Sequence, residues 1–266
     1  MLECVVNVSE GRDGAVLSAI AAAGGRCLLD LHSDAHHHRA VLTLAGDGVE
    51  DAARAVTAAA VARLDLRTHQ GVHPRLGVVD VVPFVPLAGS GLDEALAARD
   101  RFLAWAAAEL DLPGFAYGPE RSLPEVRRTA FAGLAPTAGP PVPHATAGAV
   151  CVGARPVLVA YNVWLAGATG VDEARGVAAA VRRPGLVRAL GLDVGGRAQV
   201  SMNLVEPLKV GPADAFDAVG ALVAVDGAEL VGLVPAAVLD AVPRRRWAEL
   251  DLGPSRTIEG RLAAAR

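Results

Sequence analysis

The chain has 266 residues, of which 52% are hydrophobic and 4% aromatic, and its formal net charge is −4 at pH 7. This length and apolar fraction suffice to bury the core of one large or two small globular domains, built mainly from Ala, Val and Leu. The negative charge argues against nucleic acid as the main partner, and polar residues interrupt the apolar stretches before they reach membrane-spanning length.

The opening residues do not read as a secretory signal, and we expect a cytoplasmic protein that associates with no membrane. The three cysteines, Cys4, Cys27 and Cys151, show no CxxC spacing and lie in apolar surroundings. The sequence therefore predicts neither a disulfide framework nor a zinc site, but buried thiols.

The first ninety residues alternate between strand and helix patterns. Strands are predicted over residues 3–8, 26–31, 39–44 and 78–85, and alanine-rich helices over 13–24 and 49–64. The order is β-α-β-β-α-β, the split βαβ arrangement of ferredoxin-like folds.

A second unit of the same order is predicted after residue 150. It comprises a strand within 150–164, a helix over 171–181, strands over 187–193 and 198–205, a helix over 213–225 and a strand over 230–234. A helix over 92–110 and a short strand over 115–117 lie between the units. The predicted fold class is α+β, with two ferredoxin-like subdomains.

The segment 67–86 carries the strongest chemical signal, because His69 and His73 precede a strand-like apolar run. Histidine exchanges protons near neutral pH. His73 is the better candidate for a general acid-base, since Pro74 stiffens the backbone after it and biases it to an extended conformation.

Two charged residues follow His73 closely. Arg75 and Asp80 could bind an anionic substrate or orient the imidazole ring, as acid-base sites require. The alternative interpretation is that His69 and His73 are ordinary loop residues.

Histidines are also dense between residues 30 and 39. His36 and His38 could point the same way from an extended segment, with Asp34 nearby. A metal site, a solvated polar loop and a substrate-binding loop are all open here, and our prediction is that no metal is bound. This loop and the loop carrying His73 each precede a strand of the same sheet, so they could meet.

Three further features suit a ligand site. Asn162 and Asn203 place polar amides inside strand patterns, where a ligand can supply hydrogen-bond partners. The Pro- and Gly-rich stretch from Gly139 to Gly148 is either an interdomain linker or a preformed ligand-binding loop. No P-loop or dinucleotide fingerprint occurs.

Taken together, these pieces resemble the formiminotransferase family. The His-Pro-Arg block is the most specific part, and the resemblance spans nearly the whole chain. It rests on ECVVNVSEG (3–11), LLD (28–30) with Arg39 and Val41, HPRLGVVDVVPFVP (73–86), GAR (153–155), AQVS (198–201) with Asn203-Leu204, and LVGLVP (230–235).

The resemblance implies transfer of a formimino (or formyl) group between N-formimino-glutamate and N5 of tetrahydrofolate, which serves as co-substrate. It implies an N-terminal subdomain over 1–148 and a C-terminal subdomain over 149–266, with a groove between them that binds the substrates. It also implies a homodimer and no metal. His73 stands at the catalytic position, and the family binds folate at 139–148. The predicted substrate- and folate-binding residues are Asp30, His32, His38, Arg39, Arg75, Asp80, Gly139, Pro140, His144, Thr146, Gly148, Asn162 and Asn203.

The chain also departs from the family pattern. His32 and His38 stand where family members commonly have aspartate and asparagine, Trp164 replaces a polar residue, and Val6 replaces a proline. These departures leave the one-carbon donor open, and no cyclodeaminase domain is expected. The alternatives are a transferase of the same fold acting on another amidine or acyl donor, and a small-molecule or metal sensor.

Overall fold

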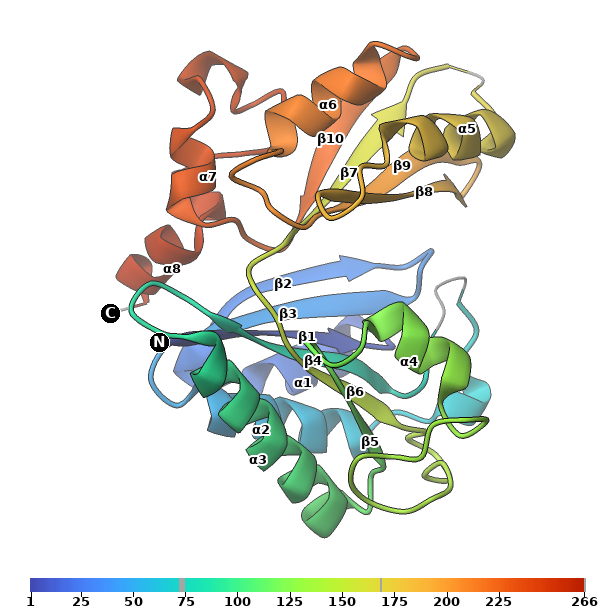
Figure 1. The fold of residues 1–266 in the computed structure, drawn as a ribbon, viewed down its shortest axis with the longest axis vertical. Coiled ribbons are helices and arrows are strands. Elements are labelled where there is room, and N and C mark those ends of the chain that lie inside the picture. The colour runs from blue at the N-terminus through green and yellow to red at the C-terminus, as the bar shows by residue number, and fades with distance from the viewer. Residues whose placement is uncertain (72–74, 168, 266) are drawn as a thin grey trace. The chain divides into compact units, whose positions relative to one another are not determined.

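The computed structural model describes residues 1–71, 75–167 and 169–265, and the chain forms two compact units, Met1–Pro156 and Val157–Arg266 (Figure 1). Within these ranges no helix has the length and apolar character needed to cross a membrane.

The first unit is built around a mixed sheet with the strand order β2-β3-β1-β4-β6-β5. The neighbours among β1 to β4 are antiparallel, whereas β6 runs parallel to both β4 and β5. The elements are β1 (Leu2–Val8), α1 (Gly14–Ala22), β2 (Leu28–Asp34), β3 (Arg39–Ala45), α2 (Val49–Val61), β4 (Val79–Pro86), α3 (Leu92–Leu110), β5 (Gly114–Tyr117), α4 (Leu123–Thr129) and β6 (Val150–Ala154).

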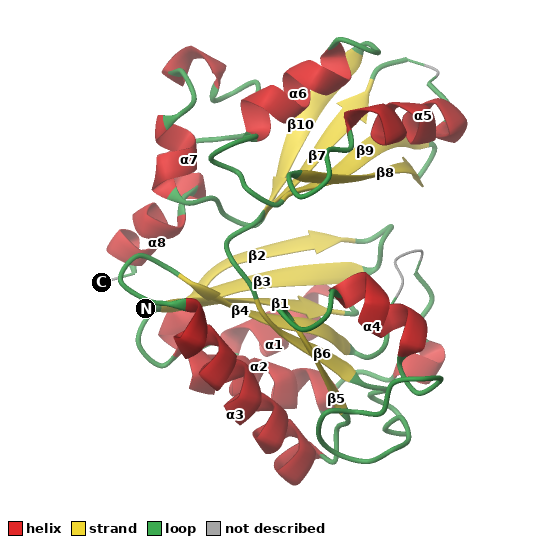
Figure 2. Ribbon diagram, viewed as in Figure 1, coloured by secondary structure: helices red, strands yellow, loops and turns green. Residues whose placement is uncertain are grey.

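Helices α1, α2 and α3 bury their apolar sides on one face of this sheet (Figure 2). Val82 and Phe84 of β4 belong to that core, whereas Val81 packs in a second cluster with Val126 of α4. Successive side chains of a strand point to opposite faces, so α4 covers the other face of the sheet.

The second unit has an antiparallel sheet with the strand order β10-β7-β9-β8. Its elements are β7 (Val159–Leu165), α5 (Val171–Val181), β8 (Val187–Val194), β9 (Arg197–Leu204), α6 (Pro212–Gly220), β10 (Val225–Val231), α7 (Ala236–Asp240) and α8 (Ile258–Ala264). Short 3-10 turns occur in both units, at Gly25–Cys27, Leu66–Thr68, Arg244–Arg246 and Pro254–Arg256.

Both units therefore confirm the predicted β-α-β-β-α-β order and the α+β class. In each, the four strands of that order are arranged with the first and third in the centre, which agrees with a ferredoxin-like arrangement. The three cysteines are free and buried, as predicted.

Three details differ from the sequence prediction. Residues 150–164 hold two strands, and β6 pairs with β4 and β5, so it belongs to the first unit and lies beyond the predicted boundary at residue 148. The last strand begins earlier than predicted, at Val225, because α6 already ends at Gly220. Helix α4 was not predicted, although Ser122 caps its first turn by accepting from the Glu125 N–H.

Candidate active site

Most predicted site residues of the first unit that the structure describes gather at one edge of its sheet. Strand β1 ends at this edge, and β3 and β4 begin there because both are antiparallel to β1. Strand β6 is parallel to β4 and begins there as well. The loops 9–13, 35–38 and 130–149 and the described loop residues 62–71 and 75–78 therefore converge at this edge (Figure 1).

The histidine-rich hairpin and residues 69–71 of the loop that carries His73 meet here, which confirms the predicted meeting of the two loops. His69 Nε2 lies 3.0 Å from the carbonyl oxygen of His38, and the two imidazole rings stack with centroids 4.2 Å apart. Gly71 packs so closely that an added Cβ would lie 2.7 Å from the carbonyl oxygen of His37. Position 71 therefore has no room for a side chain.

The hydrogen bonds of His69 determine its tautomer. The carbonyl of His38 can only accept, so His69 Nε2 carries a proton and donates it. The guanidinium of Arg75 can only donate, so His69 Nδ1 is the acceptor of the bond from Arg75 Nη1. Burial lowers the pKa of His69, and the charge of Arg75 lowers it further, against an opposing contribution from the His38 carbonyl. His69 is thus held neutral at neutral pH.

His38 is held by the loop after β1. Its Nδ1 accepts from the Gly11 N–H at 3.1 Å and lies 3.3 Å from Glu10 Oε1. Burial lowers the pKa of His38, although Glu10 opposes this effect. The Glu10 carboxylate accepts from the backbone N–H groups of Gly11, Arg12 and Asp13, and these bonds outweigh burial and lower its pKa.

The metal-site hypothesis centred on Asp34, His36 and His38. Asp34 instead accepts from the backbone N–H groups of His36 and His37 and pairs with the His37 ring at 3.0 Å. Its pKa is held well below the usual range, chiefly by the bond from His37. Among the described residues no group of three or more His, Cys, Asp or Glu side chains could hold a metal ion.

Asp80 lies beneath this edge and is 1% exposed. One carboxylate oxygen accepts from the Leu76 N–H at 2.9 Å, and the other pairs with Arg127 of α4. Burial raises the pKa of Asp80, while the charges of Arg127 and Arg39 and the Leu76 N–H oppose the rise. Asp80 was predicted to bind an anionic substrate or to orient the imidazole ring, and this role stays a prediction.

Arg39 is the first residue of β3 and interacts electrostatically with the same carboxylate, that of Asp80. Burial lowers its pKa to about 10, the charge of Asp80 opposes this shift, and the like charge of Arg127 adds to it. Arg75 is also under the influence of Asp80. Three guanidinium groups therefore interact electrostatically with the one buried carboxylate of Asp80.

The Pro- and Gly-rich loop is anchored at both ends within the first unit. Near its start, the Gly114 N–H donates to the Ala138 carbonyl at 2.9 Å. At its end, the Ala149 N–H donates to Leu76 and the Val78 N–H donates to Ala147, both at 2.9 Å. The loop is therefore an ordered part of the same sheet edge, and it is not merely a linker.

Several residues of this loop have backbone conformations or hydrogen bonds that hold it in place. Gly139 and Gly148 adopt left-handed backbone conformations, with φ of 88° and 73°, which glycine tolerates best. His144 Nδ1 accepts from the Ala147 N–H at 3.0 Å, and the Thr146 carbonyl accepts from Leu66 at 2.7 Å. Pro140, between these anchors, is partly buried.

Four predicted residues lie on other elements of the chain. Asp30 and His32 lie along β2, opposite Thr43 and Val41 of β3. Asn162 and Asn203 lie in the second unit, on β7 and β9, and Asn203 is exposed. His73 lies outside the described residues.

Asn162 belongs to a polar cluster that sequence reasoning missed. Its side chain donates to Glu229 Oε2 at 3.1 Å, and Gln199 donates to the same oxygen at 3.4 Å. Asn162 and Gln199 are buried. The alternation of strands β7 and β9 could have placed both residues on one face of the sheet. Arg127 was also missed, and the signal for its helix was Ser122 followed three residues later by Glu125.

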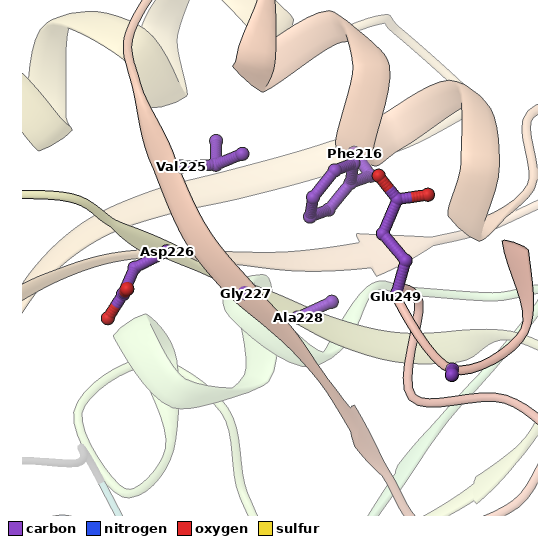
Figure 3. A pocket seen from close by; sticks show the side chains of 7 residues that line it. Phe216, Val225, Asp226, Gly227, Ala228 and Glu249 are labelled. Atoms are coloured by element: carbon purple, nitrogen blue, oxygen red, sulfur yellow. The ribbon is translucent and has the colours of Figure 1, made fainter.

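A hollow of about 460 Å³ lies beside β10, lined by Phe216, Val225, Asp226, Gly227, Ala228, Ala248 and Glu249. Figure 3 shows that its acidic side chains, Asp226 and Glu249, do not point toward one another. Each is paired with an arginine, Asp226 with Arg197 at 2.7 Å and Glu249 with Arg246 at 2.9 Å. None of the predicted site residues that the structure describes lines this hollow.

Residues 1–155 match the family described as the formiminotransferase domain, N-terminal subdomain. The chain belongs to the formiminotransferase family. It is 35% identical to glutamate formimidoyltransferase of Streptococcus pyogenes serotype M1 over 90% of both chains, and 33% identical to that of Thermoplasma acidophilum over 88% of both. It is also 34% identical to the formimidoyltransferase-cyclodeaminase of Sus scrofa, with 91% of this chain aligned to 51% of that protein. The protein is accordingly a transferase enzyme.

Proposed function

We propose that this formiminotransferase moves a formimino group from N-formimino-glutamate to N5 of tetrahydrofolate, with His73 as general acid-base. The observation that carries the proposal is the pairing of the loop 139–148 with the segment that follows His73. The isolated bridge between Gly77 and Gly148 and the flanking backbone hydrogen bonds join the two. A folate bound by this loop would be held near the segment that carries the histidine.

The chemistry requires two proton movements. N5 attacks the formimino carbon and loses a proton as the new C–N bond forms. The bond from that carbon to the glutamate nitrogen then breaks, and this nitrogen gains a proton. One imidazole can accept the first proton and return it to the leaving nitrogen. Holding both substrates together contributes further rate enhancement.

The neighbouring histidine does not compete for this role. His69 has its Nε2 proton committed to the His38 carbonyl and its Nδ1 committed to Arg75. A ring with both nitrogens engaged cannot shuttle protons without breaking these bonds. His69 therefore suits the role of positioning Arg75, and His73 that of catalyst.

For the other predicted residues at this edge of the sheet, contact with a substrate is also a proposal. Arg39 and Arg75 suit carboxylates of the donor or the folate, and His144 and Thr146 belong to the anchored loop. The roles of Asp30, His32, Asn162 and Asn203, the groove between the subdomains, the homodimer and the cytoplasmic location stay predictions as well.

The test is an assay of formimino transfer to tetrahydrofolate by His73→Ala. We expect kcat to fall by about 100- to 10,000-fold, the usual contribution of general acid-base catalysis. His36→Ala is the matched control in the hairpin turn and should keep wild-type activity. If His73→Ala turns over as fast as the wild type, the catalytic assignment is wrong. Calorimetry addresses the sensor alternative, which would be favoured by binding of nickel or zinc without binding of a reduced folate.

A further inference from the structure

The arginine on α4 has more hydrogen-bonding capacity than its surroundings use. A guanidinium offers five N–H donors, and within the described part of the chain Arg127 has one acceptor in hydrogen-bond distance, the Asp80 carboxylate. Its Nε is buried and has no partner there. The side chain is 22% exposed, so part of it faces solvent at the sheet edge.

A structural arginine in the same unit shows the contrast. Arg99 is 8% exposed and donates to Asp100 at 2.8 Å, to Glu120 at 2.6 Å and to the Tyr117 carbonyl at 3.4 Å. Its charge is balanced by two carboxylates. The carboxylate that pairs with Arg127 is that of Asp80, and it also interacts electrostatically with Arg39 and Arg75.

Asp80 therefore interacts electrostatically with three guanidinium groups, those of Arg39, Arg75 and Arg127. The packing of α4 brings Arg127 to this place, since Val126 is buried against Val81 of β4.

We propose that Arg127 is a substrate-binding residue for a dicarboxylate, and that Asp80 positions it. Under the proposed function, on which this inference rests, the dicarboxylate is the glutamate part of the donor. A guanidinium binds carboxylate oxygens through paired N–H donors, and the remaining donors of Arg127 are suited to such a bond. Asp80 orients the group through one oxygen and holds the Leu76 backbone through the other.

The experiment measures the binding of glutamate, the product, by calorimetry on the full-length protein. Arg127→Met should weaken glutamate binding by about 10- to 100-fold, as expected for losing a hydrogen bond between charged groups. In the transfer assay it should raise KM for the donor with a smaller change in kcat. The matched control is Arg128→Met, on the same helix, which is exposed and should bind glutamate like the wild type.

Because Arg127→Met leaves Asp80 buried without its partner, the variant could unfold. The double variant Asp80→Asn/Arg127→Met removes both charges and should recover the melting temperature while glutamate binding stays weak. If the double variant also recovers wild-type glutamate binding, or if folded Arg127→Met binds glutamate as Arg128→Met does, Arg127 is only structural and the inference is overturned.

Failure of the proposed function gives a different result. In that case the wild type would bind glutamate in an Arg127-dependent way but would not transfer a formimino group from formimino-glutamate. Dicarboxylate binding by Arg127 would then be upheld and the donor assignment lost.

Discussion

Replacing Gly148 by alanine should disturb both the fold of the first unit and the loop proposed to bind folate. Gly148 has a φ of 73°, and its N–H and carbonyl both bond to His144. A Cβ at this position would lie 2.2 Å from the carbonyl oxygen of Leu76 and 3.0 Å from the Cα of Gly77. These are backbone atoms, so the loop and the segment after Arg75 must separate to admit a methyl group.

Two costs contribute to the expected loss of stability. A left-handed backbone costs a residue with a side chain about 1–2 kcal/mol, and forcing a methyl group into a packed site adds about 1–3 kcal/mol. We therefore expect Gly148→Ala to lower the free energy of unfolding by about 2–5 kcal/mol. Gly89→Ala is the matched control, because Gly89 has a φ of 88° but no atom within 4 Å of the added Cβ. It should lose about 1–2 kcal/mol.

Urea denaturation followed by circular dichroism measures both variants. The transfer assay gives a second readout, in which Gly148→Ala should raise KM for tetrahydrofolate and Gly89→Ala should leave it unchanged. Equal stability losses in the two variants would refute the close contact between Gly148 and the Leu76 carbonyl. An unchanged KM in a folded Gly148→Ala variant would count against the placement of folate on this loop.

Two further predictions concern polar groups that are partly or fully buried. The pKa values of His38 and His69 are lowered in the folded protein, so the unfolded chain takes up protons on these rings first as pH falls below about 6.5. Stability should therefore decrease between pH 7.5 and pH 5.5, and urea titrations should show a smaller decrease for His38→Asn/His69→Gln. In the second unit, the buried Tyr161 hydroxyl donates to the Leu250 carbonyl at 3.0 Å. Tyr161→Phe should cost about 1–3 kcal/mol in the same assay, because the carbonyl loses its partner, and no measurable loss would exclude this bond.

Local patterns were enough to identify most elements and the family. The helix predicted over 92–110 agrees with α3, and the helix predicted over 171–181 agrees with α5. Apolar periodicity and glycine or proline stops lie within a few residues of the backbone they describe, so they can be read without knowing the fold. The His-Pro-Arg block is similarly local, and it was sufficient to indicate the transferase.

The arrangement of the candidate site depends on contacts between residues distant in the chain. Asp80 and Arg127 are 47 residues apart, and His38 and His69 are 31 apart. Whether the carboxylate of Asp80 is exposed to a substrate or buried depends on which helix packs over strand β4. The pairing of β6 with the first sheet likewise depends on hydrogen-bonding partners in β4 and β5. Strand pairing and burial are properties of the assembled chain, and for this reason residue types and spacing could propose the members of the site without assigning their roles.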